Sequence, residues 1–304
     1  MLSVCNYHYI RKDFSAKYAS IFGATPSQFK NQLNLLKSQA TIIAPKYFID
    51  NEIEILKSNE NFILITFDDG LKEQFDLAIP ILQDLKLEAL FFVNSINFEE
   101  KKVSTVHKIH LLRSIISSEN LWTEISKESD LIFSDSDKKR ASEIYRFDDE
   151  KSACLKYYLN FKLNYSQQES IIKPIFDNYF DENEVVETLY MSNENLIYLA
   201  NNNCLGSHTH SHFPIGLLET ENAKFELLHS KNYLEKLTGN EINTVSYPYG
   251  TKETATTEIA DIAKKCGYKF GFTTTKGANN ENNNPLLLNR FDCNDLIGGK
   301  NYKQ

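Results

Sequence analysis

A nearly unbroken apolar run at residues 61–67 constrains the fold of this chain more than any other feature. The run is short, contains β-branched residues and stops at Asp68-Asp69-Gly70, which is typical of a strand buried on both faces of a parallel sheet. Residues 73–85 then show helical spacing, although Pro80 is expected to kink or break that helix. A second apolar run follows at residues 89–93. Strand, helix and strand within about 35 residues predict a βαβ unit and an α/β fold.

The same alternation continues in the second half of the chain, where each predicted strand runs into polar or glycine-containing sequence. The predicted strands span residues 2–10, 61–67, 89–93, 204–206, 243–247 and 268–274, and the apolar residues 286–288 lead into the polar segment 289–292. The predicted helices start at Thr25-Pro26 or span residues 73–85, 221–238 and 252–265. Because the carboxyl ends of the strands meet on one face of a (β/α) barrel, we expect the polar residues that follow them to lie together.

Residues 97–195 interrupt this alternation. They are polar, charged and rich in Tyr and Phe, and their apolar residues recur mostly at helical spacing. We interpret them as a helical insertion, a lid or an interaction surface, within a single barrel that spans residues 1–304. The alternative is two independent domains, in which case residues 97–195 fold alone.

Charge and composition exclude several classes of function. The chain has 304 residues, with Lys+Arg 33 against Asp+Glu 41 and a net charge of −8, which argues against a nucleic-acid partner. There is no apolar stretch of about 18 residues and no cationic leader, so we expect no transmembrane segment and a cytoplasmic location. The chain has 5 cysteines, an odd number, and no C-x-x-C motif occurs. Both observations argue against a disulfide framework or a cysteine zinc site.

Two clusters of side chains could carry chemistry. The adjacent carboxylates Asp68 and Asp69 point in different directions on an extended chain, so one can bind a metal while the other faces a bound water. An ordinary Asp-Gly turn is the alternative. His208 and His212 are four residues apart, so on a helical turn both imidazoles would face one cation, whereas His210 would point elsewhere. A solvated polar loop is the alternative for this cluster.

Together the clusters supply one Asp and two His ligands, which suit zinc or a similar divalent transition metal. Three protein ligands plus water is the pattern of a catalytic metal site, and the second carboxylate could then serve as a base. A third motif, Ser246-Tyr247-Pro248-Tyr249-Gly250, could shape a pocket wall with Pro248 and aim a backbone N–H at developing negative charge. Taken alone, this motif is better interpreted as a plain turn.

Thr-Phe-Asp-Asp-Gly, His-Thr-His-Ser-His and Tyr-Pro-Tyr-Gly, in this order, resemble the motifs of the polysaccharide deacetylases. This carbohydrate esterase family is named for the chitooligosaccharide deacetylase homology domain. The resemblance covers residues 1–95 and 196–295 and leaves the insertion outside. It implies a distorted (β/α)7 barrel and metal-dependent removal of an N-acetyl group from a sugar.

The resemblance also implies roles for individual residues. It makes Asp68 the general base, and it gives Asp69, His208 and His212 as the metal ligands. It makes Tyr249 the donor of a backbone N–H to the oxyanion beside the metal. Zinc is the expected metal ion.

The sequence departs from the family pattern in two places. Ser246 stands where the third motif often begins with Arg, so we expect Arg290 to supply the missing guanidinium, with a surface salt bridge as the alternative. The late Leu-x-His that provides the general acid is absent after Gly250. His8 resembles that motif moved to the N-terminus, as in circularly permuted members such as the poly-N-acetylglucosamine deacetylases, and we expect it to be the general acid. A core histidine on a strand is the alternative.

Three further histidines receive no catalytic role. His107 and His110 are three apart on a predicted helix, and we interpret them as helix-surface or substrate-pocket residues rather than a second metal site. His229 is interpreted as structural.

The expected substrate is an N-acetylated sugar, either nucleotide-linked, lipid-linked or a short oligosaccharide, in surface polysaccharide biosynthesis. Two alternatives remain open at this stage. One is a catalytically silent barrel that binds carbohydrate or a partner protein through residues 97–195. The other is a hydrolase of another non-peptide amide, such as a formamide or a ring amide.

Overall fold

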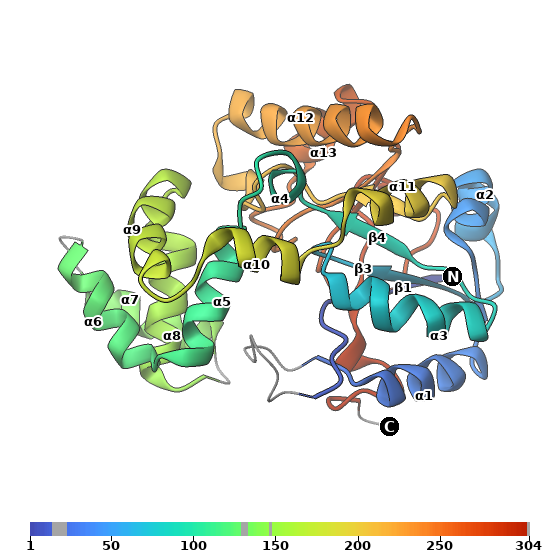
Figure 1. The fold of residues 1–304 in the computed structure, drawn as a ribbon. Helices are drawn as coiled ribbons and strands as arrows, with labels where there is room; N and C mark the ends of the chain where they lie inside the picture. Colours follow the sequence, from blue (N-terminus) through green and yellow to red (C-terminus); the bar gives the residue numbers. More distant parts are fainter. Residues whose placement is uncertain (14–22, 129–132, 146–147, 303–304) are drawn as a thin grey trace. The chain divides into compact units, whose positions relative to one another are not determined.

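The computed structural model describes residues 1–13, 23–128, 133–145 and 148–302 (Figure 1). The described residues form two compact units. The first is made of residues from 1–13, 23–102 and 186–302, and the second is made of residues from 103–185. The second unit therefore begins and ends inside the bounds of 97–195 predicted for the insertion. Its status as an insertion into one barrel of residues 1–304 stays a prediction.

A parallel sheet forms the centre of the first unit. Its neighbouring strands follow the order β7-β6-β5-β4-β3-β1-β8, and a short strand, β2, pairs with β3. The bounds are β1 (Leu2–Tyr7), β2 (Thr41–Ile42), β3 (Phe62–Phe67), β4 (Leu90–Val93), β5 (Leu205–Ser207), β6 (Thr244–Ser246), β7 (Phe270–Phe272) and β8 (Phe291–Asp292). The predicted βαβ order is confirmed.

Residues 285–292 join the two ends of this order. Gly271 donates its N–H to the carbonyl of Pro285 at 2.9 Å, and Leu288 donates to Gly271 at 2.8 Å, so this segment runs beside β7. The same segment continues into β8, which pairs with β1 at Cys5↔Phe291. The sheet therefore curls into the distorted (β/α)7 barrel that the sequence predicts.

Alternation along the strands separates an apolar layer from a polar one. A buried hydrophobic cluster contains Leu2, Val4, Leu64, Leu90, Phe92, Phe270, Phe272 and Leu288. Two residues beyond Val4, Leu64 and Phe92, on the same face of each strand, stand Asn6, Thr66 and Asn94, all buried. The barrel is thus filled by apolar side chains near the amino ends of its strands and by polar side chains near their carboxyl ends.

Helices cover the first unit, several of them with the predicted starts and stops. They are α1 (Pro26–Lys37), α2 (Pro45–Lys57), η1 (Gln74–Ala78), α3 (Ile79–Asp84), α4 (Ile96–Glu99), α11 (Asn193–Asn201), η3 (Ile215–Leu217), α12 (Thr220–Thr238), α13 (Thr257–Lys265) and η4 (Cys293–Asp295). Thr25 and Gln28 form a capping box at the predicted start of α1. The predicted helix at 252–265 begins later, because Thr256 caps α13 through a bond from the N–H of Ile259.

The predicted helix at residues 73–85 is present, but it changes from π to α geometry just before Pro80. A π-helical turn, η1, comes first, and Pro80 then lies in the first turn of α3, where a missing N–H is tolerated. The chain stays helical from residue 72 to residue 84, so the irregularity expected at Pro80 is a π-helical turn rather than a break. The π-helical turn brings the buried side chain of Gln74 towards the end of β3, where it donates to a backbone carbonyl.

The second unit is helical. Its helices are α5 (Thr105–Ile115), α6 (Ser118–Glu128), α7 (Asp135–Ile144), α8 (Glu150–Tyr157), η2 (Tyr158–Lys162) and α9 (Tyr165–Asp177), and α10 (Glu182–Leu189) crosses the boundary between the units. Lys108 is buried, with its Nζ 2.8 Å from Glu169 and 3.0 Å from Glu182. Two carboxylates around one buried ammonium satisfy the pairing that a buried charge requires. The helical character predicted for this region is confirmed.

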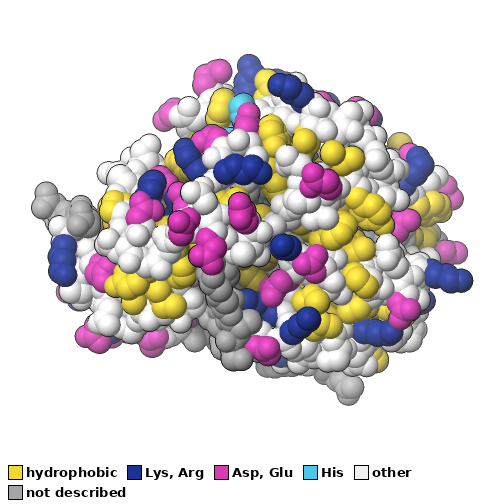
Figure 2. All heavy atoms as spheres, in the orientation of Figure 1, with side chains coloured by type: hydrophobic (Ala, Val, Ile, Leu, Met, Phe, Trp, Pro, Cys, Tyr) yellow, Lys and Arg dark blue, Asp and Glu magenta, His cyan; other side chains and the backbone are white. Residues whose placement is uncertain are grey.

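Acidic and basic side chains are interspersed on the face drawn in Figure 2, rather than gathered into a patch of one sign. Among the described residues, no helix combines the length and the apolar character needed to cross a membrane.

Candidate metal centre and active site

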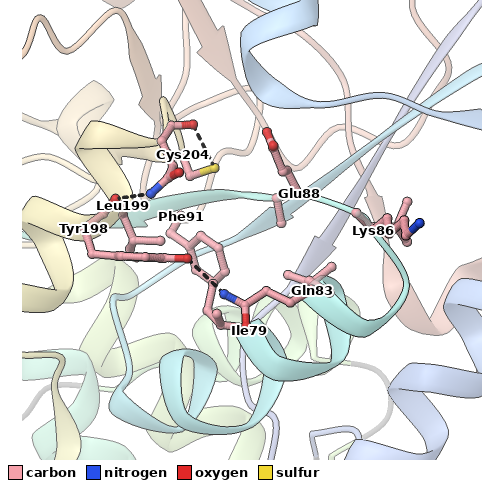
Figure 3. A pocket seen from close by; sticks show the side chains of 12 residues that line it. Ile79, Gln83, Lys86, Glu88, Phe91, Tyr198, Leu199 and Cys204 are labelled. Carbon is pink, nitrogen blue, oxygen red and sulfur yellow. Dashed lines mark hydrogen bonds between the residues drawn. The ribbon is translucent and has the colours of Figure 1, made fainter.

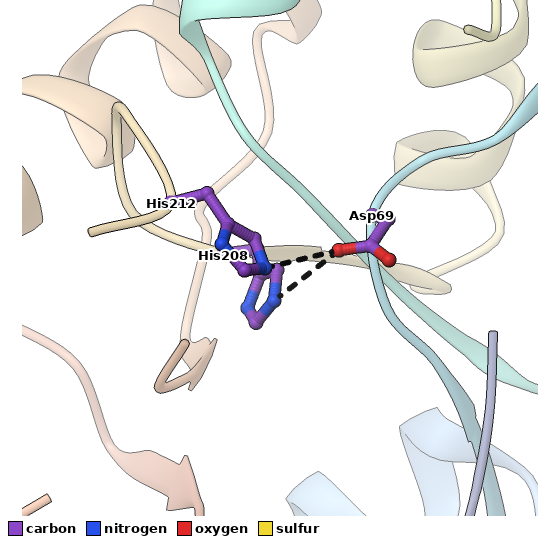
Figure 4. A group of neighbouring side chains, drawn as sticks. All are labelled: Asp69, His208 and His212. Carbon is purple, nitrogen blue, oxygen red and sulfur yellow. Dashed lines mark ion pairs between the residues drawn. The ribbon is translucent and has the colours of Figure 1, made fainter. Parts of the chain in front are cut away.

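Asp69, His208 and His212 converge at the carboxyl ends of β3 and β5 (Figure 4). The Asp69 Oδ1 lies 3.3 Å from the Nε2 of His212 and 3.6 Å from the Nε2 of His208. Asp69 and His208 are buried and His212 is nearly so. The three predicted ligands are therefore brought together although Asp69 is far from the histidines in the sequence.

The loop that carries the two histidines is not helical, which corrects the expectation of a helical turn. Thr209 and His212 both adopt positive φ angles of 64°. The loop is held in this form by β4 and the residues after it: His208 donates its N–H to Val93 at 2.8 Å, and Ser95 donates to Thr209 at 3.3 Å. These left-handed residues turn the imidazoles of His208 and His212 towards one another, with ring centroids 4.9 Å apart.

A backbone contact fixes the His208 ring. Its Nδ1 lies 2.7 Å from the carbonyl oxygen of Ser246, so an Nδ1–H can donate there and leave the Nε2 lone pair facing Asp69. Burial, opposed by Asp68 and assisted by His212, lowers the pKa of His208 to about 4. The imidazole is therefore neutral at pH 7, as a metal ligand must be.

The donor set and its spacing fit a divalent metal ion. A tetrahedral ion with bonds of about 2.1 Å keeps its donor atoms about 3.4 Å apart, and the Asp69–histidine distances of 3.3 and 3.6 Å match that spacing. Two imidazoles and one carboxylate suit zinc and related transition metals. A direct ion pair would instead require a protonated His208, which its low pKa opposes.

Asp68, next to Asp69 in the chain, binds Arg290. Nη1 and Nη2 of Arg290 donate to Oδ1 and Oδ2 of Asp68 at 2.8 and 2.7 Å, and Asn6 Nδ2 donates to Oδ2 at 3.1 Å. Burial acts to raise the pKa of Asp68, but the Arg290 guanidinium outweighs it and holds that pKa well below its ordinary value. Asp68 is therefore ionised at neutral pH.

Arg290 itself is buried and fully engaged. Its Nε donates to the carbonyl of Thr273 at 2.8 Å, and its Nη2 donates to the Ser246 hydroxyl at 2.9 Å. Ser246 thus accepts Arg290 with its side chain and His208 with its carbonyl oxygen. Arg290, the residue expected to replace the family's Arg, pairs with Asp68. Because Arg290 is buried, the alternative of a surface salt bridge is excluded.

His8 stands at the open side of the same carboxylate. Its Nε2 lies 3.9 Å from Oδ2 of Asp68, and its side chain is 42% exposed, so it is not a core histidine. The buried Gln74 amide donates to the His8 carbonyl at 2.8 Å and to the Asp68 carbonyl at 2.5 Å. Gln74 therefore ties the ends of β1 and β3 together.

The third motif adjoins His212. The Tyr249 ring lies 5.5 Å from the His212 ring, edge to face, and Pro248 is buried beside it. Tyr249 has a φ of 60°, and its carbonyl accepts from the Thr274 hydroxyl at 2.6 Å. Gly250 follows with a φ of +54°, and a Cβ there would lie 2.5 Å from the Thr274 nitrogen, so the turn requires glycine.

Sequence reasoning missed Asn6 and Gln74, both of which contact Asp68. Asn6 is two residues before His8, so strand alternation could have placed both on one face of β1. Gln74 carried no such signal, because its position depends on the π-helical turn before Pro80. Among the described residues, His107 and His110 belong to no group of three metal-binding side chains.

A cavity of about 340 Å³ lies at the other end of the strands (Figure 3). Its lining includes Glu88, which precedes β4, and Cys204, which precedes β5. Gln83 and Tyr198 are joined across it by a hydrogen bond of 3.0 Å. Asp69, His208 and His212 do not line this cavity, so it is separate from the candidate metal site.

The fold is a (β/α) barrel whose strand ends carry one Asp and two His that could hold a metal ion, and comparison with known proteins gives its family. The family model described as polysaccharide deacetylase matches residues 56–129 and 178–271, which is more than half of the chain. The chain belongs to the polysaccharide deacetylase family. No curated protein sequence matches it significantly.

Several solved structures share the fold at low sequence identity. IcaB from Ammonifex degensii has a TM-score of 0.59 and 17% identity, over 96% of this chain and 91% of that one. The Streptococcus pyogenes deacetylase PplD has a TM-score of 0.53 and 18% identity, over 96% and 91%. BA0330 of Bacillus anthracis has a TM-score of 0.54 and 18% identity, over 96% of this chain, but the chain spans only 64% of its length.

Proposed function

We propose that this chain is a metal-dependent carbohydrate deacetylase that removes the N-acetyl group from an amino sugar, with zinc as the bound ion. Membership of the polysaccharide deacetylase family supports this reaction class. The observation that carries the proposal is the adjacency of two carboxylates with separate partners. Asp69 faces His208 and His212, while Asp68 faces Arg290.

Asp69, His208 and His212 are the proposed metal ligands. A divalent ion bound by them would polarise the acetamide carbonyl and lower the pKa of a coordinated water towards about 7. The Ser246 carbonyl keeps the His208 Nε2 directed at the ion through the contact with Nδ1.

Asp68 is the proposed general base. Arg290 keeps the Asp68 carboxylate ionised and fixes both of its oxygens. Asp68 can therefore accept the proton of the attacking water without rearranging. Such positioned proton transfer contributes about 100- to 10,000-fold to a rate. In this account Arg290 is a positioning residue, because it acts through Asp68.

His8 and Tyr249 complete the proposed machinery. The exposed imidazole of His8 lies beside Asp68 and would, when protonated, donate to the leaving amine of the sugar. The backbone N–H of Tyr249 would donate to the developing oxyanion, next to His212. Pro248 would form the pocket wall that keeps this N–H in place.

The substrate that we propose is an N-acetylated sugar, nucleotide-linked, lipid-linked or a short oligosaccharide, and the setting is surface polysaccharide biosynthesis in the cytoplasm. One structural relative, PplD, is described in complex with acetate, the product that this reaction releases. We propose that residues 97–195 act as a lid or as an interaction surface for the sugar or a partner.

The test is acetate release from N-acetylated chito-oligosaccharides by the zinc-loaded protein, compared with Asp69→Asn. The proposal predicts release by the wild-type protein and loss of at least 100-fold in the variant. Exposed Asp135, which is paired with Lys138 on the surface, gives the matched control Asp135→Asn with an unchanged rate. If the wild-type protein binds these sugars but releases no acetate, the chain is instead a silent carbohydrate-binding barrel.

A further inference from the structure

A second group of metal-binding side chains lies on the first unit, outside the proposed active site. It consists of Glu99 at the end of α4, His210 in the loop after β5 and His229 in α12, whose donor atoms all lie within 4.8 Å of one another. The His229 Nε2 is 2.7 Å from Glu99 Oε2, and the rings of His210 and His229 are 4.6 Å apart. His229 was expected to be structural, and the structure places it in this group.

Contacts at both ring nitrogens fix the orientation of His210. Its Nδ1 lies 2.8 Å from the hydroxyl of Ser95, which is fully buried. In one tautomer Nε2–H donates to Glu100 and Ser95 donates to Nδ1; in the other Ser95 accepts from Nδ1–H, which leaves the Nε2 lone pair for an ion that would displace the contact with Glu100. An outer hydrogen bond of this kind fixes the tautomer and the ring of most histidine ligands.

The carboxylates around His210 are not equivalent. Glu100 Oε1 lies 3.1 Å from the His210 Nε2, but Lys102 pairs with the other oxygen of Glu100 at 2.7 Å. Glu99 pairs with His229 instead. The three groups of the cluster come from three separate elements, so a bound ion would join α4 and α12 to the loop.

The environment of the cluster is partly apolar. The Phe225 ring stacks on His229 at 4.8 Å and meets the edge of His210 at 5.7 Å. His210 is buried, whereas Glu99 and His229 are each 35% exposed, so an ion can enter from solvent.

We propose that Glu99, His210 and His229 bind a second divalent transition metal ion, with zinc, nickel and copper as the ions that imidazole ligands favour. His210 lies between His208 and His212 in the chain, and its N–H and that of Ser211 already donate to Glu226 of α12 at 3.0 and 2.8 Å. The second ion adds a side-chain link between the same loop and α12. Its role is to stabilise the loop that carries two ligands of the first ion.

Metal stoichiometry tests this proposal independently of activity. Chelator-stripped protein is titrated with zinc in equilibrium dialysis, and the bound metal is measured by elemental analysis. The wild-type protein is expected to bind two equivalents per chain, and His229→Gln and Asp69→Asn are expected to bind one each. His110→Gln, in the second unit, is the matched histidine control and should bind two.

Two further variants separate this site from adventitious histidine binding. Ser95→Ala should weaken the second equivalent by about 10- to 100-fold and leave the first unchanged, because it removes the outer hydrogen bond of His210 alone. In the Asp69→Asn background, zinc should still raise the melting temperature, and adding His229→Gln should abolish that shift. One equivalent in the wild-type protein, lost in Asp69→Asn and kept in His229→Gln, would overturn the proposal.

Discussion

Arg290 holds Asp68 through two parallel hydrogen bonds of 2.8 and 2.7 Å, although the two residues are 222 positions apart in the chain. Both are buried, so the pair is shielded from water. A planar fork matches a carboxylate in a way that an ammonium cannot. This pair fixes the proposed base, and it exists because residues 285–292 close the barrel against β1.

Replacing Arg290 by Lys should therefore lower both stability and activity. The charge remains, but the second hydrogen bond is lost, and we expect a loss of about 1.5–3 kcal/mol in the free energy of unfolding. We also expect kcat to fall at least 10-fold with KM little changed, because the base is mispositioned. Denaturant unfolding and acetate-release kinetics measure the two effects.

The control for that variant is Arg140→Lys, at an exposed pair with Glu143 of 3.4 Å. Surface pairs of this kind contribute about 0–1 kcal/mol, so the control should behave as wild type. Equal behaviour of the two variants would contradict the role given to Arg290.

Asp68→Asn should separate catalysis from metal binding. Asp69 and the histidines do not depend on Asp68 for their contacts with one another, so the protein should retain its zinc. Turnover should fall by about 100- to 10,000-fold, the usual contribution of a general base. Zinc content and kcat are the measurements, and loss of zinc together with activity would show that the two carboxylates act as one ligand.

The sequence predicts the strands of the barrel and the residues that follow them because each strand is a short apolar run with a polar end. It does not predict how His208 and His212 meet. Helical spacing suggested a shared face, whereas the structure uses left-handed residues at Thr209 and His212. Those conformations are imposed by hydrogen bonds to β4 and the residues after it, which are distant in sequence.

The other residues around Asp68 differ in how far the sequence could predict their positions. Arg290 was expected near Asp68 only because the sequence has Ser246 where the family often has Arg. The position of Arg290 beside Asp68 depends on the pairing of β8 with β1, which closes the barrel. Asn6 could have been inferred from strand alternation with His8. Gln74 could not, because a π-helical turn places it.

The metal-free protein should lose stability as the pH falls from about 6.5 to about 4. The folded His208 has a pKa of about 4, below the value of about 6.5 in the unfolded chain, so the unfolded state binds the extra proton in this window. Stability from this group is complete above pH 6.5 and is lost on acidification. At pH 4.5 the loss should be about 2 kcal/mol relative to pH 7.

Urea unfolding of the metal-free protein at both pH values measures this loss. His208→Gln, which cannot take up the proton, should show a correspondingly smaller change between pH 7 and pH 4.5. An identical pH dependence in the variant and in the wild-type protein would rule out His208 as the group responsible.

Gly250→Ala should damage the site more than a matched glycine variant. At Gly250 both the positive φ and the close approach of Thr274 oppose a side chain. At Gly239 the φ is +71°, but a Cβ would meet no heavy atom of the described residues within 4 Å. Gly239→Ala should therefore cost about 1–2 kcal/mol and leave kcat unchanged.

For Gly250→Ala we expect a larger loss of stability and a fall in kcat, because the preceding N–H of Tyr249 is displaced. Thermal unfolding and acetate release are measured on both variants. A Gly250→Ala enzyme with wild-type kcat would argue against the role proposed for Tyr249.

The central claim is that Asp69, His208 and His212 jointly hold one divalent ion. Anomalous diffraction at the zinc edge, from crystals of zinc-loaded protein, tests it most directly. The account predicts a peak within about 2.2 Å of the Asp69 carboxylate and of both Nε2 atoms. A zinc-saturated crystal with no peak among these three groups, or with a peak bound by other side chains instead, would contradict it.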